Sequence, residues 1–252
     1  VEKSLYINTR LEINFMALPK LGYPTYECEL PSTGKTIKYR PFLVKEEKVL
    51  LMALEANDEK QVIGGVKDLL KNCIVSRIKV DQLPSFDLEY LFLKIRAASI
   101  GEMITLSVTC LDDNETEVEA LININDVEVK KQEGHSAKIM FNDTTGIIMK
   151  YPSMKQFIDR EFLQKDLGTE DVYDFIANSI DQIFDDEEVY DSSTTTPKEF
   201  RQFVDTLTTK QFEKIQDFYA TCPKLSHTFS VTNPKTGKES TYTIEGLQSF
   251  FA

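Results

Sequence analysis

The chain has 252 residues, of which 41% are hydrophobic, and its formal net charge is -12. This length and composition are sufficient to bury the core of one large domain or two modest ones. The acidic balance argues against a nucleic-acid backbone or an anionic membrane as the partner, because both are bound through basic surfaces. No apolar run reaches the roughly 18 residues of a membrane span, and the N-terminus lacks the apolar segment of a signal peptide.

The cysteines are few and widely spaced. Cys28, Cys73, Cys110 and Cys222 form no C-x-x-C pair. This pattern is typical of free thiols in a reducing cytoplasm.

The first 15 residues precede the stretch MALPK, which begins at Met16 and has the pattern of a natural protein start. We therefore interpret residues 1–15 as an extension of the protein proper. Tyr6 and Ile7 contribute to the apolar character of this extension, which would allow it to bind a partner as a strand or a helix.

The stretch PSTGKT (31–36) ends like a phosphate-binding loop, but Glu29 occupies the place of the first glycine of that signature. Alternating β-forming residues flank it, and the pattern P-x-T-G-K recurs at 234–238. Proline sets φ at the first corner of a turn, and glycine supplies a positive φ two residues later. Both stretches are predicted to be β-hairpin turns around Gly34 and Gly237. A phosphate-binding enzyme that uses Gly34-Lys35-Thr36 stays open as a remote alternative.

The N-terminal half mixes helices with strands. Strong helix formers predict helices over 45–56 and 58–72, and apolar spacing predicts a third helix over 86–98 that is capped by Ser85. Alternating β-formers predict two strands that return on each other: 105–110 and 117–124.

The C-terminal half begins after a polar stretch at 130–134. A strand-turn-strand is predicted over 138–149, followed by helices over 152–164 and 171–184. Two further helices are expected where Thr196 and Glu199 form a capping box, and again where Thr208 and Gln211 can form a second one.

We expect an α+β fold of two small mixed domains, each of which combines β-hairpins with amphipathic helices. The expected units are the extension 1–15, an N-terminal domain over 16–130 and a C-terminal domain over 131–252.

The chain offers little for catalysis. His135 lies in a polar linker and is expected to be solvated. His227 closely follows Cys222, and such residues can form a nucleophilic pair or bind a metal. A structural role for His227 is favoured, because no further ligand lies nearby in the sequence. We predict no catalytic residue, no cofactor and no metal.

Two features indicate binding instead. The apolar tail either docks on its own domain or inserts into a partner. An acidic run lacks the residue order of a calcium loop and is interpreted as a solvated loop, with a docking surface for a basic partner as the alternative. Together with Tyr6 and Ile7, these features give the candidate partner-binding residues: Leu247, Phe250 and Phe251 in the tail, and Asp185, Asp186, Glu187 and Glu188 in the run.

Longer stretches carry a family resemblance. MALPKLGYPTYECELPSTGKTIKYRPFLVKEEKVLLMA resembles the opening of the baseplate hub assembly proteins of T-even-type (T-four-like) contractile-tailed phages. In the family pattern a hairpin leads to an aromatic-Arg-Pro-Phe motif and then to a Lys-Glu-Glu-Lys motif. In this chain these motifs are Tyr39-Arg40-Pro41-Phe42 and Lys45-Glu46-Glu47-Lys48. The stretches KVDQLPSFDLEYLFLKIRAASIGE, FVDTLTTKQFEKIQDFYATCPKL and EGLQSFF fit the same family, so the resemblance covers nearly all of 16–252.

The resemblance implies a non-enzymatic chaperone or assembly factor. Such a protein binds hub subunits in the cytoplasm of the infected bacterium while the hub is built. The alternative is a structural subunit that is retained in the hub of the virion tail baseplate. Either interpretation makes baseplate hub proteins the partners, and both leave a homo-oligomer open.

Overall fold

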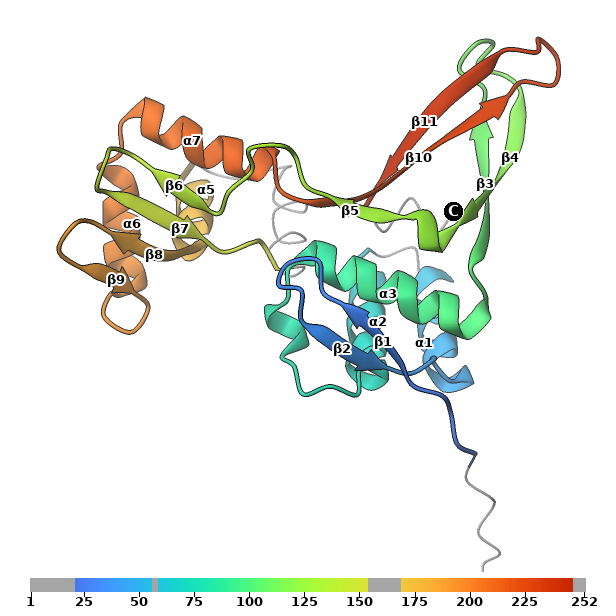
Figure 1. Cartoon of the computed structure of the whole chain (residues 1–252), viewed down its shortest axis with the longest axis horizontal. Coiled ribbons are helices and arrows are strands. Elements are labelled where there is room, and N and C mark those ends of the chain that lie inside the picture. The colour runs from blue at the N-terminus through green and yellow to red at the C-terminus, as the bar shows by residue number, and fades with distance from the viewer. Residues whose placement is uncertain (1–20, 56–58, 154–168, 247–252) are drawn as a thin grey trace, which may run out of the picture.

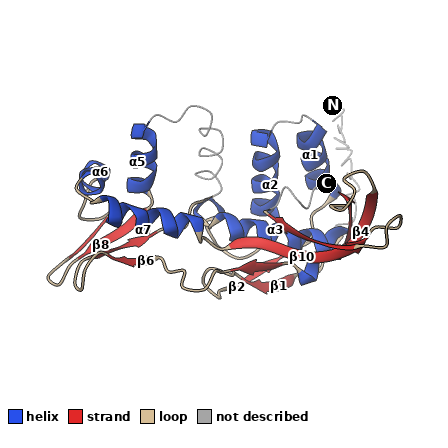
Figure 2. Ribbon diagram, turned by 90° about the horizontal axis from the view of Figure 1, so that it is seen from above, coloured by secondary structure: helices blue, strands red, loops and turns tan. Residues whose placement is uncertain are grey.

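The computed structural model describes residues 21–55, 59–153 and 169–246, which form six α-helices and several small antiparallel sheets (Figure 1). The predicted α+β class is confirmed. Helices α1, α2, α5 and α6 lie along one side of the molecule, and the strands lie along the opposite side (Figure 2).

The first part of the chain is a hairpin followed by helices. Strand β1 (Tyr26–Glu29) pairs with β2 (Thr36–Tyr39), and the turn between them holds Gly34 at φ 68°. The helices that follow are α1 (Val44–Glu55), α2 (Glu59–Cys73), the 3-10 turn η1 (Val80–Gln82) and α3 (Ser85–Ile100). The three α-helices confirm the predictions to within a few residues. Ser85 is the first residue of α3 rather than its cap, which is Pro84.

Two long hairpins form an arm that projects from this part (Figure 1). The arm consists of β3 (Met103–Thr109) with β4 (Glu117–Asn123), and β10 (Lys224–Thr232) with β11 (Glu239–Glu245). At its base the 3-10 turn η2 (Ile124–Asp126) leads into β5 (Glu128–Lys130), which pairs with β10.

The second part is a four-stranded sheet with helices on one face. The sheet has the order β6-β7-β8-β9 and is antiparallel throughout. Its strands are β6 (Lys138–Met140), β7 (Gly146–Met149), β8 (Ile180–Phe184) and β9 (Val189–Asp191). The helices are α5 (Thr169–Asn178), α6 (Pro197–Asp205) and α7 (Thr209–Ala220).

The prediction of one helix over 171–184 is wrong. Helix α5 ends at Asn178, and the buried Ser179 donates its backbone N–H to the carbonyls of Phe175 and Ile176. The chain then continues as β8, which pairs with β7 along its length. Pairing with a strand distant in sequence, rather than local spacing, decides this structure.

Both predicted capping boxes are present. Thr196 accepts from the backbone N–H of Glu199, whose carboxylate accepts from the N–H of Thr196 at 2.7 Å. Thr208 likewise donates its N–H to the side chain of Gln211 at 2.8 Å. These boxes fix where α6 and α7 begin. Most of the helix predicted over 152–164 lies outside the described residues.

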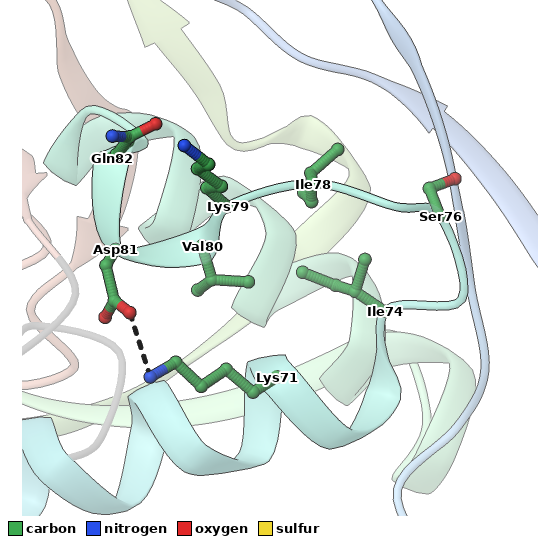
Figure 3. Close-up of a pocket in the computed structure, with 8 residues that line it drawn as sticks. All are labelled: Lys71, Ile74, Ser76, Ile78, Lys79, Val80, Asp81 and Gln82. Atoms are coloured by element: carbon green, nitrogen blue, oxygen red, sulfur yellow. Dashed lines mark ion pairs between the residues drawn. The ribbon is translucent and has the colours of Figure 1, made fainter.

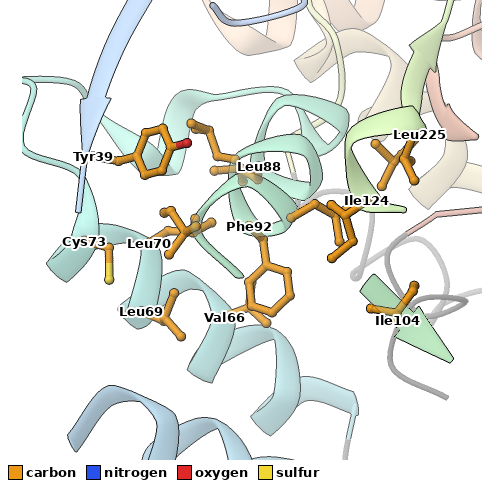
Figure 4. Close-up of a cluster of buried hydrophobic side chains, with 14 of the residues drawn as sticks. Tyr39, Val66, Leu69, Leu70, Cys73, Leu88, Phe92, Ile104, Ile124 and Leu225 are labelled. Atoms are coloured by element: carbon orange, nitrogen blue, oxygen red, sulfur yellow. The ribbon is translucent and has the colours of Figure 1, made fainter. Parts of the chain in front are cut away.

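Two hydrophobic clusters hold the described chain together. The first joins β1, β2 and the helices α1–α3 to the arm, and it includes Leu225 and Val231 from the C-terminal hairpin (Figure 4). The second lies between the four-stranded sheet and α5–α7, with Ile147 and Ile215 fully buried. The domain limits given above stay a prediction.

Candidate partner-binding surfaces

The turn PSTGKT is tied to a buried acid. Asp87, at the start of α3, is buried and accepts from Ser32 N at 3.0 Å and from the Ser32 hydroxyl. Burial raises the pKa of Asp87, and the bonds from Ser32 offset part of this rise. A phosphate on this turn would meet a carboxylate instead of free N–H donors. This geometry opposes a phosphate-binding role for Gly34-Lys35-Thr36.

The second P-x-T-G-K turn repeats the arrangement in the arm. Gly237 has φ 73°, and the turn residues Asn233 and Thr236 both donate to the carboxylate of Asp112, from the tip of the β3–β4 hairpin. The Asn233 bond is 2.9 Å long. The hairpin interpretation of both stretches is confirmed, and each turn is also clamped to a distant segment.

The expectation that His135 is solvated is wrong. His135 is 7% exposed and stacks on Phe218 with ring centroids 5.3 Å apart. Its Nδ1 lies 2.8 Å from Thr221 Oγ1, and its Nε2 lies 3.1 Å from the hydroxyl of Tyr151. Thr221 donates its own proton to the carbonyl of Asp217, so Nδ1–H of the imidazole is the donor. Burial and nearby Lys131 lower the pKa of His135, which supports a neutral structural residue.

His227 and Cys222 belong to different surroundings. Cys222 packs against the second cluster, whereas His227 lies in the arm, where it stacks near Phe229 and bonds to the carbonyl of Asp126 at 3.1 Å. Among the described residues, no group of three or more His, Cys, Asp or Glu is placed to hold a metal ion. None of the helices in the described ranges is long and apolar enough to cross a membrane.

A surface hollow of about 490 Å³ lies between α2 and α3, on the chain from Lys71 to Gln82 (Figure 3). Asp81 at its edge forms ion pairs with Lys67 and with Lys71, the latter at 3.0 Å. These pairs hold the pKa of Asp81 below its usual range. The charged groups of Lys71 and Asp81 in this hollow are therefore paired with each other.

The acidic run forms the turn between β8 and β9. Asp185 accepts from the backbone N–H groups of Glu187 and Glu188, which keeps its pKa low and closes the turn. Asp186, Glu187 and Glu188 are exposed, and none of them forms an ion pair within the described part of the chain. The other candidate binding residues lie outside the described residues: Tyr6, Ile7, Leu247, Phe250 and Phe251.

Helix α1 carries an exposed apolar face that the sequence patterns did not reveal. Leu50 and Ala53 are buried, but Val44, Leu51 and Met52 are 80%, 52% and 60% exposed. The second half of α1, from Val49 to Ala53, is apolar on all sides, a pattern that ordinarily indicates burial. Large exposed apolar side chains grouped on one element are a mark of an interaction surface.

A family model described as the T4 bacteriophage base plate protein matches residues 23–252. The chain belongs to this family. No curated protein and no solved structure matches it. As a phage baseplate protein it works in contact with other baseplate proteins. The matched range contains every described helix and strand.

Proposed function

We propose that this baseplate protein is a non-enzymatic assembly factor that binds hub subunits in the cytoplasm of the infected bacterium. The exposed apolar face of α1 is the observation that carries the proposal. A helix that shows Val44, Leu51 and Met52 to solvent gains stability when a partner removes them from water, at roughly 25 cal/mol per Å² of apolar surface.

The polar groups of the chain support a binding role rather than catalysis. Asp87 and Asp112 clamp turns, and His135 is held in an aromatic stack. These side chains, which could otherwise begin a reaction, are thus occupied in structural contacts. We further propose that the tail residues Leu247, Phe250 and Phe251 and the extension residues Tyr6 and Ile7 contribute to hub binding.

A tagged copy in infected cells tests the proposal. Mass spectrometry of hub intermediates and of purified virions gives the amount of the protein in each. Presence in intermediates and absence from virions is the expected result. A fixed ratio in both would make the protein a structural subunit of the hub, and absence from both would refute a hub role.

Two variants separate the surfaces. Replacing Leu51 and Met52 by Ser should abolish recovery of the protein in hub intermediates while the fold survives, because both side chains are exposed. Deleting residues 247–252 tests the tail in the same assay. Exposed Lys210, replaced by Ser at the start of α7, is the control and should behave like the wild type.

A further inference from the structure

The four-stranded sheet has one face covered by helices and one face without a described partner. Ile139, Ile147 and Ile183 are in register on adjacent strands and belong to the second cluster. Side chains alternate between the two faces of a sheet. Their neighbours along each strand therefore point to the opposite face, where no labelled element lies (Figure 2).

That opposite face, here named the outer face, carries an apolar row across all four strands. The strand pairings align Met140, Gly146, Phe184 and Val189. Val189 is 57% exposed, and Met140 and Phe184 are half-buried. Ile148 in the next row adds a further half-buried apolar side chain. The row is continuous because it crosses strands that are hydrogen-bonded side by side.

Gly146 forms the floor of this row. A Cβ at Gly146 would stand 2.7 Å from Cζ of Phe184 and 2.5 Å from the carbonyl oxygen of Ile139. The ring of Phe184 therefore lies directly against the backbone of β7. The ammonium of Lys138, which lies on the same face of the sheet, is 4.8 Å from the centroid of this ring, so the ring already contacts one cation of this chain.

Carboxylates border one end of the row. Because Gly146 pairs with Phe184, the turn that precedes β7 and the turn that follows β8 lie at the same end of the sheet. The first turn holds exposed Asp143, and the second holds exposed Asp186 and Glu187. We call these three residues the acidic rim. They form no ion pair within the described part of the chain, so they are available to a partner's cations. Two cations of this chain also lie near the row: Lys138 on the outer face, and Lys214, which donates to the carbonyl of Met140 at 2.6 Å.

We propose that the outer face binds a segment of a partner protein in which an apolar side chain is flanked by Lys or Arg. The apolar side chain packs on Phe184 and Val189, and the flanking cations meet the acidic rim. This inference rests on the proposed function, since it names the chemistry of one contact that a baseplate partner makes. An extended segment suits the dimensions of the face. Four strands spaced about 4.8 Å apart and three to five residues long give an area on the order of 200 Å², well below the ~800 Å² per partner of a standard interface.

Charge complementarity selects a basic partner over a second copy of this chain. Two copies that met through this face would bring their acidic rims together, and the chain as a whole carries a net charge of -12. An anionic lipid surface is opposed by the same rim.

The test uses the full chain, labelled for NMR, and a short synthetic peptide in which Phe and Val are flanked by Arg and Lys. We expect amide shifts to change at Met140, Ile148, Phe184 and Val189. The double variant Asp186→Lys/Glu187→Lys should weaken the peptide's affinity about tenfold, and more at low salt. The matched control, Glu117→Lys/Glu119→Lys, makes the same charge change on exposed residues of β4 in the arm and should leave the affinity nearly unchanged.

Three results would overturn the inference. The amide shift changes could centre on another surface, or the two double variants could lose peptide affinity equally. A peptide in which Ser replaces Phe and Val could also bind with the same affinity. Self-association of the wild type that the rim variant abolishes would show a second copy as the occupant, which also contradicts it. Recovery of the protein in hub intermediates is scored separately. If the protein is not recovered in hub intermediates but the peptide still shifts the expected amides, only the proposed function is refuted. If the protein is recovered but the peptide does not shift these amides, only this surface is refuted.

Discussion

At the scale of single residues, a buried ion pair explains the motif around Tyr39-Arg40-Pro41-Phe42. Arg40 and Glu46 are both buried, and the guanidinium contacts the two carboxylate oxygens at 3.1 and 3.4 Å. Glu46 also accepts from Leu43 N at 2.6 Å, which caps the start of α1. Burial alone would raise the pKa of Glu46, but the bonds from Arg40 and Leu43 lower it overall.

Glu46→Gln should destabilise the protein by about 3–5 kcal/mol, because it keeps the shape of the side chain but leaves a buried guanidinium without its counter-charge. Urea unfolding measures the loss. The control is Lys45→Ala, whose side chain is 74% exposed and contacts the same carboxylate; it should cost less than about 1 kcal/mol. Similar midpoints for the two variants would show that the pair contributes little.

His135 predicts a pH dependence of stability. The folded state lowers the pKa of this histidine below its ordinary value near 6.5. Below that value the unfolded chain binds the proton more readily, so stability is complete above about pH 6.5 and falls as the pH drops towards the folded pKa. The size of the loss is set by the difference between the folded and unfolded pKa values. Thermal unfolding from pH 7.5 to 5 measures it. His135→Gln should flatten the slope in this range, and an unchanged slope would assign it to other groups.

At the scale of elements, each P-x-T-G-K hairpin is held by an aspartate from another segment. Asp87→Ala should cost about 1–3 kcal/mol, because it leaves the N–H and hydroxyl of Ser32 without their acceptor. Asp87→Asn should cost less, since the amide oxygen still accepts from Ser32 N. Ser32→Ala combined with Asp87→Ala should cost less than the sum of the single changes, and strict additivity in the denaturant midpoints would contradict the clamp.

Local signals in the sequence predicted those elements whose structure is set locally. The turns at Gly34 and Gly237 need a positive φ, and the capping box of Thr196 and Glu199 closes within one helical turn. Strand β8 escaped prediction because Ile180 and Ile183 also fit the spacing of a helix, and only the pairing with β7 makes them strand residues.

The outer face and the exposed face of α1 were not predicted either, because they too depend on contacts between segments that are distant in the sequence. The acidic run is visible in the sequence, but its place beside Phe184 and Asp143 depends on the β7–β8 register. The exposed face of α1 was not predicted because the run from Val49 to Ala53 is apolar on all sides, so its spacing does not tell which side chains are buried.

At the scale of the whole molecule, the C-terminal hairpin packs in the same hydrophobic cluster as the first half of the chain. The three-stranded sheet places β10 between β5 and β11, so the C-terminal hairpin is bonded to a strand from the middle of the chain. Leu225 is fully buried in the first cluster beside Ile124 (Figure 4). The second part, from β6 to α7, is thus an insertion between two segments that share one core.

This arrangement predicts which part of the molecule a core substitution loosens. Leu225→Ala should cost about 2–5 kcal/mol, because the cavity lies in a fully buried site. Hydrogen exchange should accelerate in α3 and β5, while α5–α7 keep their protection. Ile215→Ala, at a fully buried position of the second cluster, is the matched control and should give the opposite pattern. Equal acceleration in both parts for both variants would mean that the two clusters unfold as a single cooperative unit.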